Sequence, residues 1–139
     1  MDREEIKTYL PHREPMLLID TLEKQGDSFR STYRVRGDEF FLQGHFPDYP
    51  VVPGVILCEL MAQACALVIG EDIKGKTPYY AGLDKIRFKR MVRPGDTVDV
   101  VVTPTDVRGN VFIVEAKATV AGELCCKGIM KFVVMDHRA

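Results

Sequence analysis

The chain lacks a charge imbalance. Of its 139 residues, 19 are lysine or arginine and 20 are aspartate or glutamate, which gives a net charge of −1. A broad nucleic-acid surface needs a basic excess, so no such partner is expected. Histidines are also few: His12, His45 and His137 are scattered without metal-ligand spacing, and no glycine-rich nucleotide fingerprint occurs. The sequence therefore predicts no metal and no cofactor.

Long apolar runs are missing too. The longest, from Val55 to Ile69, falls short of the ~20 residues that span a bilayer. The N-terminus is charged, which is not typical of a signal peptide. The four cysteines form no CxxC motif and are interpreted as reduced apolar filler. A cytoplasmic protein without a membrane segment is expected.

The hydrophobic pattern predicts one domain over residues 1–139, with a short helix, then two strands, one long apolar helix and four more strands. The expected ranges are a helix over 2–9, strands over 16–24 and 28–36, an ordered loop over 37–53, a helix from Pro53-Gly54 to near Gly70, and strands over 79–88, 97–107, 111–120 and 123–134. One apolar helix must lie against one curved antiparallel sheet. The fold class is therefore α+β, with the sheet wrapped around a long buried helix.

The apolar helix contains two strongly polar residues, Glu59 and Gln63. A buried carboxylate needs a partner, a raised pKa or a chemical task. We expect burial to raise the pKa of Glu59, and Gln63 at i+4 to orient its carboxyl group. A pair that only satisfies its own hydrogen bonds is the alternative.

A histidine stands in the loop before this helix. His45 lies in a segment rich in glycine and proline, and an unperturbed histidine has a pKa near ~6.5, so it can accept a proton at neutral pH. His45 is thus a candidate general base and Glu59 a candidate general acid. Gly54, at the helix start, is a candidate backbone donor to a developing oxyanion. A glycine required only by the turn after Pro53 is the alternative, and the two interpretations are compatible.

These residues carry a resemblance. The run Gly44-His45-Phe46-Pro47, then Pro50 to Val55, and Glu59 with Met61-Ala62-Gln63 resemble the FabZ class of β-hydroxyacyl-[acyl carrier protein] dehydratases of bacterial type II fatty acid synthesis. Leu10-Pro11-His12-Arg13 resembles the opening of that family, and the likeness runs over nearly the whole chain. It implies the hotdog fold and dehydration of a β-hydroxyacyl thioester to the trans-2-enoyl product.

The resemblance also implies further roles. The Val51 carbonyl would orient the ring of His45, and Phe46 and Tyr79 would line or gate the acyl tunnel. His45 of one subunit would face Glu59 of another in a homodimer, and the family favours a trimer of dimers. The partner would be acyl carrier protein bearing the phosphopantetheine-linked acyl chain.

Three cations alternate along one expected strand. Lys85, Arg87 and Lys89 would share one strand face and could dock the acidic carrier protein. A solvated strand face is the alternative. Two other functions compete with the dehydratase: a hotdog thioesterase, against which His45 argues, and a non-catalytic acyl-binding module. Acyl length, isomerase side activity and dimer against hexamer stay open.

Overall fold

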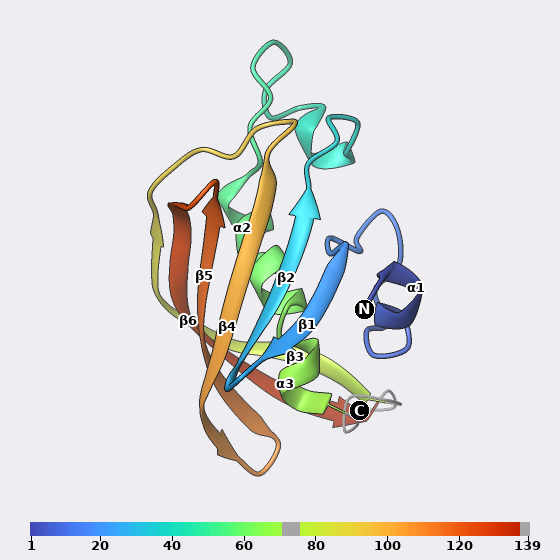
Figure 1. Ribbon diagram of the computed structural model, residues 1–139, viewed down its shortest axis with the longest axis vertical. Coiled ribbons are helices and arrows are strands. Elements are labelled where there is room, and N and C mark those ends of the chain that lie inside the picture. The colour runs from blue at the N-terminus through green and yellow to red at the C-terminus, as the bar shows by residue number, and fades with distance from the viewer. Residues whose placement is uncertain (71–75, 137–139) are drawn as a thin grey trace.

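The computed structural model describes residues 1–70 and 76–136, and Figure 1 shows a curved sheet around one central helix. The strands are β1 (Thr21–Gln25), β2 (Ser28–Arg34), β3 (Lys76–Phe88), β4 (Thr97–Arg108), β5 (Val111–Val120) and β6 (Glu123–Asp136). They form one antiparallel sheet in the order β1-β2-β4-β5-β6-β3. The predicted order of helices and strands along the chain and the α+β class are confirmed. The two turn-linked pairs β4–β5 and β5–β6 lie in the inner part of the sheet.

The helices are α1 (Arg3–Ile6), η1 (Phe40–Leu42), α2 (Gly54–Gln63) and α3 (Ala66–Ile69). Helix α2 lies in the hollow of the sheet (Figure 1). Five of its residues are buried: Leu57, Cys58, Leu60, Met61 and Gln63. They pack on the inward-facing residues of the sheet, which alternate along β5 with exposed or half-buried ones. Burying that apolar surface drives the sheet to wrap the helix.

Some predicted boundaries were wrong. The single helix to Gly70 is divided, because α2 ends at Gln63 and a tight turn of i→i−3 hydrogen bonds, from Cys65 N to Ala62 O and from Val68 N to Cys65 O, precedes α3. The first strand begins at Thr21 instead of 16, because the backbone at Leu18 bonds to a helix side chain and not to a strand. The short N-terminal helix is also four residues shorter than expected.

The two sheet edges differ in character. Strand β1 carries charged residues such as Glu23 and Lys24, which discourage pairing with another chain. Strand β3 has exposed apolar side chains, among them Tyr79, Leu83 and Phe88, and β6 is its one neighbour among the described strands. The β3 edge is therefore open to a further strand.

Asp20 ties the N-terminal segment to the sheet. Its carboxylate accepts hydrogen bonds from Arg3 (3.0 Å), Arg36 (2.7 Å) and the backbone N–H of Arg34 (2.8 Å). Partial burial acts to raise the pKa of Asp20, but these donors outweigh it and the pKa is lowered. A lowered carboxyl pKa stabilises the fold above the unfolded-state pKa, and the effect is lost as the pH falls through the folded-state pKa.

Asp20→Asn should therefore lower the free energy of unfolding at pH 7 by about 1–3 kcal/mol, the scale of hydrogen bonds to a charged group. Urea unfolding at pH 7 and at pH 3, at one protomer concentration, measures it. The difference from wild type should shrink at pH 3, which lies below the ordinary aspartate pKa of 3.8, because protonation of the unfolded state then offsets part of the stabilisation. Asp27→Asn, in the exposed β1–β2 turn, is the control and should change stability little. An equal loss at both pH values would contradict the account.

Candidate active site

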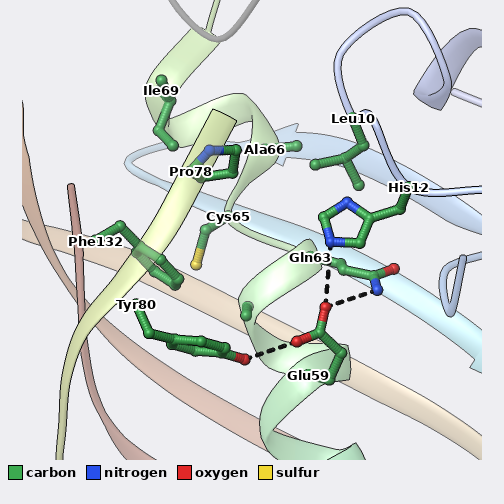
Figure 2. Close-up of a pocket in the computed structure, with 11 residues that line it drawn as sticks. Leu10, His12, Glu59, Gln63, Cys65, Ala66, Ile69, Pro78, Tyr80 and Phe132 are labelled. Atoms are coloured by element: carbon green, nitrogen blue, oxygen red, sulfur yellow. Dashed lines mark hydrogen bonds and ion pairs between the residues drawn. The ribbon is translucent and has the colours of Figure 1, made fainter. Parts of the chain in front are cut away.

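Glu59 lines a cavity of about 50 Å³ between α2, β3 and the loop before β1. Polar side chains gather at one end of it, and apolar ones form the rest of its wall (Figure 2). The lining residues are Leu10, His12, Glu59, Ala62, Gln63, Cys65, Ala66, Ile69, Pro78, Tyr80 and Phe132. A mostly apolar cavity with a few convergent polar groups is the usual form of a small-molecule site.

Three side chains converge on the Glu59 carboxyl group (Figure 2). Gln63 Nε2 donates to Oε2 at 2.9 Å, and His12 Nε2 lies 3.3 Å from the same oxygen. The Tyr80 hydroxyl donates to Oε1 at 3.0 Å. Both carboxyl oxygens are thus engaged, so the group is fixed in one orientation.

Gln63 is itself fully bonded. Its Oε1 accepts from the backbone N–H of Leu18 at 2.8 Å, and its Nε2 also donates to the carbonyl of Met16 at 2.7 Å. The side chain is 1% exposed. Helix α2 and the segment before β1 are therefore joined through the amide that holds Glu59.

The expectation of a raised pKa for Glu59 was wrong. Desolvation by burial does act to raise it, but the hydrogen bonds from His12, Gln63 and Tyr80 favour the charged form more strongly. The net effect is a lowered pKa. The sequence showed the burial but not two of the three donors.

His45 is held by a two-bond contact with Val51. The Val51 N–H donates to the His45 carbonyl at 2.9 Å, and His45 Nδ1 lies 2.8 Å from the Val51 carbonyl. A carbonyl can only accept, so Nδ1 carries the hydrogen and Nε2 is left as a proton acceptor. The contact implied by the family resemblance is present, and the ring of Phe46 stacks on that of His45 at 4.2 Å between centroids.

Gly54 begins α2 in the hollow that His45 lines. Val51, Val52, Leu57 and Phe88 line the same hollow. A Cβ at Gly54 would lie 2.9 Å from the ring of Phe88, so the close approach of that ring requires a glycine here as the chain stands. The first N–H groups of a helix have no intrahelical acceptor, which leaves them free for a ligand oxygen.

His45 and Glu59 line separate hollows of the chain. The two candidate groups of the acid/base pair therefore lie at different hollows, each of which is lined in part by α2.

Two residues at the Glu59 cavity were not selected from the sequence. Tyr79 is 47% exposed and does not line this cavity, whereas its neighbour Tyr80 does. Adjacent strand residues point to opposite faces of a sheet, and Tyr80 is paired with the buried Phe132 on β6. Knowledge of that strand pairing would have distinguished Tyr80 from Tyr79. His12 had only its place in the family-like opening as a signal.

The predicted cations do lie together. Lys85, Arg87 and Lys89 line one open hollow, and Lys117 and Lys127 join them there with a single acid, Glu115. The strand register shifts between Asp84 and Arg87, which interrupts the predicted alternation, yet all three side chains line the same hollow. Arg87, Lys127 and Lys117 are directly paired across three strands.

The described residues contain no cluster of three or more potential metal ligands, and His137 lies outside them. No helix over those residues is long and apolar enough to cross a membrane. All four cysteines are buried and free.

Solved structures share this architecture. The dehydratase heterocomplex ApeI:P from Xenorhabdus doucetiae superimposes with a TM-score of 0.80 at 19% identity, covering 96% of this chain and 92% of that one. The fluoroacetyl-CoA thioesterase FlK gives 0.69 at 18% identity, covering 84% and 90%. At such identities the likeness shows the fold alone. The molecule is a hotdog protein, as the sequence predicted.

Sequence comparisons identify the family within that class. A model of the ApeI-like family (ApeI dehydratase) matches residues 21–128. The 3-hydroxyacyl-[acyl-carrier-protein] dehydratase FabZ of Clostridium perfringens strain SM101 is 47% identical over 96% of this chain and 99% of that protein. The FabZ of Staphylococcus carnosus is 46% identical over 97% and 96%. The chain belongs to the FabZ family of 3-hydroxyacyl-[acyl-carrier-protein] dehydratases, which confirms the predicted family and enzyme class.

Proposed function

We propose that this chain dehydrates β-hydroxyacyl-[acyl carrier protein] to the trans-2-enoyl form in type II fatty acid synthesis, with His45 as general base and Glu59 as general acid. The observation that carries the proposal is the fixed ring of His45, whose Nε2 is free to accept a proton beside the start of α2. Membership of the FabZ family supports the substrate class. The free, buried cysteines agree with action in the cytoplasm.

The reaction divides between the two groups. His45 Nε2 takes the α-proton while backbone N–H groups at Gly54 stabilise the negative charge that develops on the thioester oxygen. The bond from the β-carbon to the hydroxyl oxygen then breaks, and that oxygen takes the proton of Glu59 and leaves as water. The acyl chain gains one double bond, and no cofactor takes part.

The lowered pKa of Glu59 is compatible with an acid role. At neutral pH only a minor fraction of the carboxyl groups carries the proton. A carboxyl group with a lower pKa is also the stronger acid, so each loaded group transfers its proton more readily. Gln63 and Tyr80 keep the donating oxygen in place throughout.

The two groups meet, in this proposal, across a homodimer. The separate hollows of His45 and Glu59 in one chain support it. So does the open β3 edge, where a second copy could continue the sheet over Tyr79 and Leu83. Val55, which is 75% exposed on α2, would be covered as well. The family resemblance favours three such dimers in a hexamer, with Phe46 and Tyr79 near the tunnel entrance.

Acyl carrier protein would dock on the cations of the hollow beside β3. Like charges on directly paired strand residues repel, so the row Arg87, Lys127 and Lys117 is unfavourable unless an anionic partner approaches. An acidic carrier domain with a phosphopantetheine phosphate meets that need. Lys89 extends the row toward the His45 hollow, which it also lines, and Lys85 lines the same hollow as the row.

Loss of either proposed catalytic group should slow dehydration strongly. His45→Ala and Glu59→Gln should each reduce dehydration by about 100-fold or more, the usual scale of a general acid or base. The measurement is enoyl formation from a β-hydroxyacyl carrier-protein substrate, with unfolding and subunit assembly checked in parallel. Near-full activity in either variant would show that the substituted residue is not the general base or the general acid.

Mixed dimers should recover activity if the site is shared. His45→Ala and Glu59→Gln chains, exchanged into heterodimers, regenerate one intact site in each, so we expect up to roughly half of the wild-type activity per dimer. Mass spectrometry verifies that mixed dimers have formed. Proven heterodimers without recovery would place both groups of one site in the same chain.

The docking surface is tested by charge reversal. Lys85→Glu combined with Arg87→Glu should lower kcat/KM for the carrier-bound substrate, mainly at low salt, and leave turnover of a small thiol-carried substrate little changed. Lys24→Glu combined with Arg108→Glu, on other parts of the sheet, is the matched control. Equal losses with both substrates, or none with either, would contradict docking on these residues.

A further inference from the structure

His12 contacts the proposed general acid, and the proposed mechanism gives it no task. It belongs to the loop that precedes β1 and lies on the cavity wall opposite β3 (Figure 2). Its ring Nε2 lies 3.3 Å from Glu59 Oε2. A carboxylate can only accept, so His12 Nε2 carries a hydrogen and donates it to Oε2.

The ring has no other polar contact in the described part of the chain. Nδ1 is buried and without a hydrogen-bond partner. The neighbouring wall is apolar and includes Leu10 and Ala66. A ring nitrogen buried in such a wall without a partner is costly, so the one hydrogen bond of the half-buried ring, to Glu59, calls for a reason.

The loop that carries His12 is fixed from behind. The guanidinium of Arg13 donates to the carbonyls of Leu10 at 2.8 Å, His12 at 2.7 Å and Lys7 at 3.2 Å. Leu10 is buried in an apolar cluster that also contains Ile6 and Leu17. The backbone is therefore held independently of the ring, and the ring can be changed without removing these bonds.

The groups that face Glu59 come from three elements. They are His12 from the loop, Gln63 and Cys58 from α2, and Tyr80 from β3. Gln63 and Tyr80 have second acceptors, the Met16 and Cys58 carbonyls respectively. Within the described chain, His12 is thus the donor whose side chain is devoted to the carboxyl group alone.

We propose that His12 is a positioning residue for Glu59: its Nε2–H fixes Oε2 on the loop side while Tyr80 fixes Oε1, so that the carboxyl group holds one orientation toward the reacting hydroxyl. This inference rests on the proposed function. The bond matters most when the proton is transferred, so its loss lowers kcat more than it changes KM. Removing one donor to the carboxylate also moves the titration of Glu59 to higher pH.

The test compares His12→Leu with His12→Gln. Leucine fills the wall without a donor, whereas the Nε2 of glutamine can replace the ring Nε2. For His12→Leu we expect kcat about 10-fold lower with KM little changed, at the lower end of what a misplaced catalytic group costs. In the pH profile of kcat, the limb that disappears in Glu59→Gln should move to higher pH. His12→Gln should stay within about threefold of wild type with that limb in place.

A purely structural role for His12 predicts different results. His12→Leu would then keep the wild-type pH profile, which would overturn the proposal, as would a His12→Gln enzyme as impaired as His12→Leu. If His12→Leu does not fold, His12→Asn replaces it, because its shorter amide does not reach Oε2. An active Glu59→Gln enzyme would refute the acid role of Glu59 on which this inference rests, and that result is distinct from any outcome at His12.

Discussion

The structure depends on placing one carboxylate inside a mostly apolar helix. Burying Glu59 alone would be costly, and Gln63 meets that cost by bonding to it and to the backbone of Leu18 and Met16. The amide thereby fixes the path of the chain before β1 as well as the carboxyl group. One set of hydrogen bonds serves both the fold and the site, so a change at Gln63 must disturb the two together.

The wrapped sheet makes this placement possible. Its alternating inner face encloses α2, while the end of the helix near Gly54 and the β3 edge remain accessible. The base is supplied by a loop whose shape is fixed locally by the two bonds between His45 and Val51. The acid is fixed by contacts that are distant in sequence. The two halves of the proposed chemistry are therefore positioned by different means, and in the proposal they meet across a homodimer.

Periodicity predicted most of the fold, because alternation in β4, β5 and β6 is strong and the turns between them carry glycine. It failed at two places where hydrogen bonds decide the path of the chain. The segment around Leu18 reads as a strand but bonds to Gln63, and the tight turn at Cys65 has no signal in an apolar run. Neither feature follows from local patterns.

The candidate site was predictable in part for a similar reason. His45, Glu59 and Gln63 stand close together in sequence, and the motif that they form is specific. His12 and Tyr80 approach Glu59 from 47 residues before and 21 residues after it, so only the folded chain brings them together. Their hydrogen bonds also reverse the direction expected for the pKa of Glu59. Contacts between residues distant in sequence therefore decide the direction of the Glu59 pKa shift, which burial alone had predicted wrongly.

The central claim is that the chain removes water from a β-hydroxyacyl group on acyl carrier protein. Product analysis by mass spectrometry, with a carrier-protein substrate of defined acyl length, tests it most directly. The account predicts loss of one water to give the trans-2-enoyl thioester, still attached to the carrier. Release of free carrier thiol with the hydroxyacyl acid would show hydrolysis and contradict the account, as would substrate recovered unchanged.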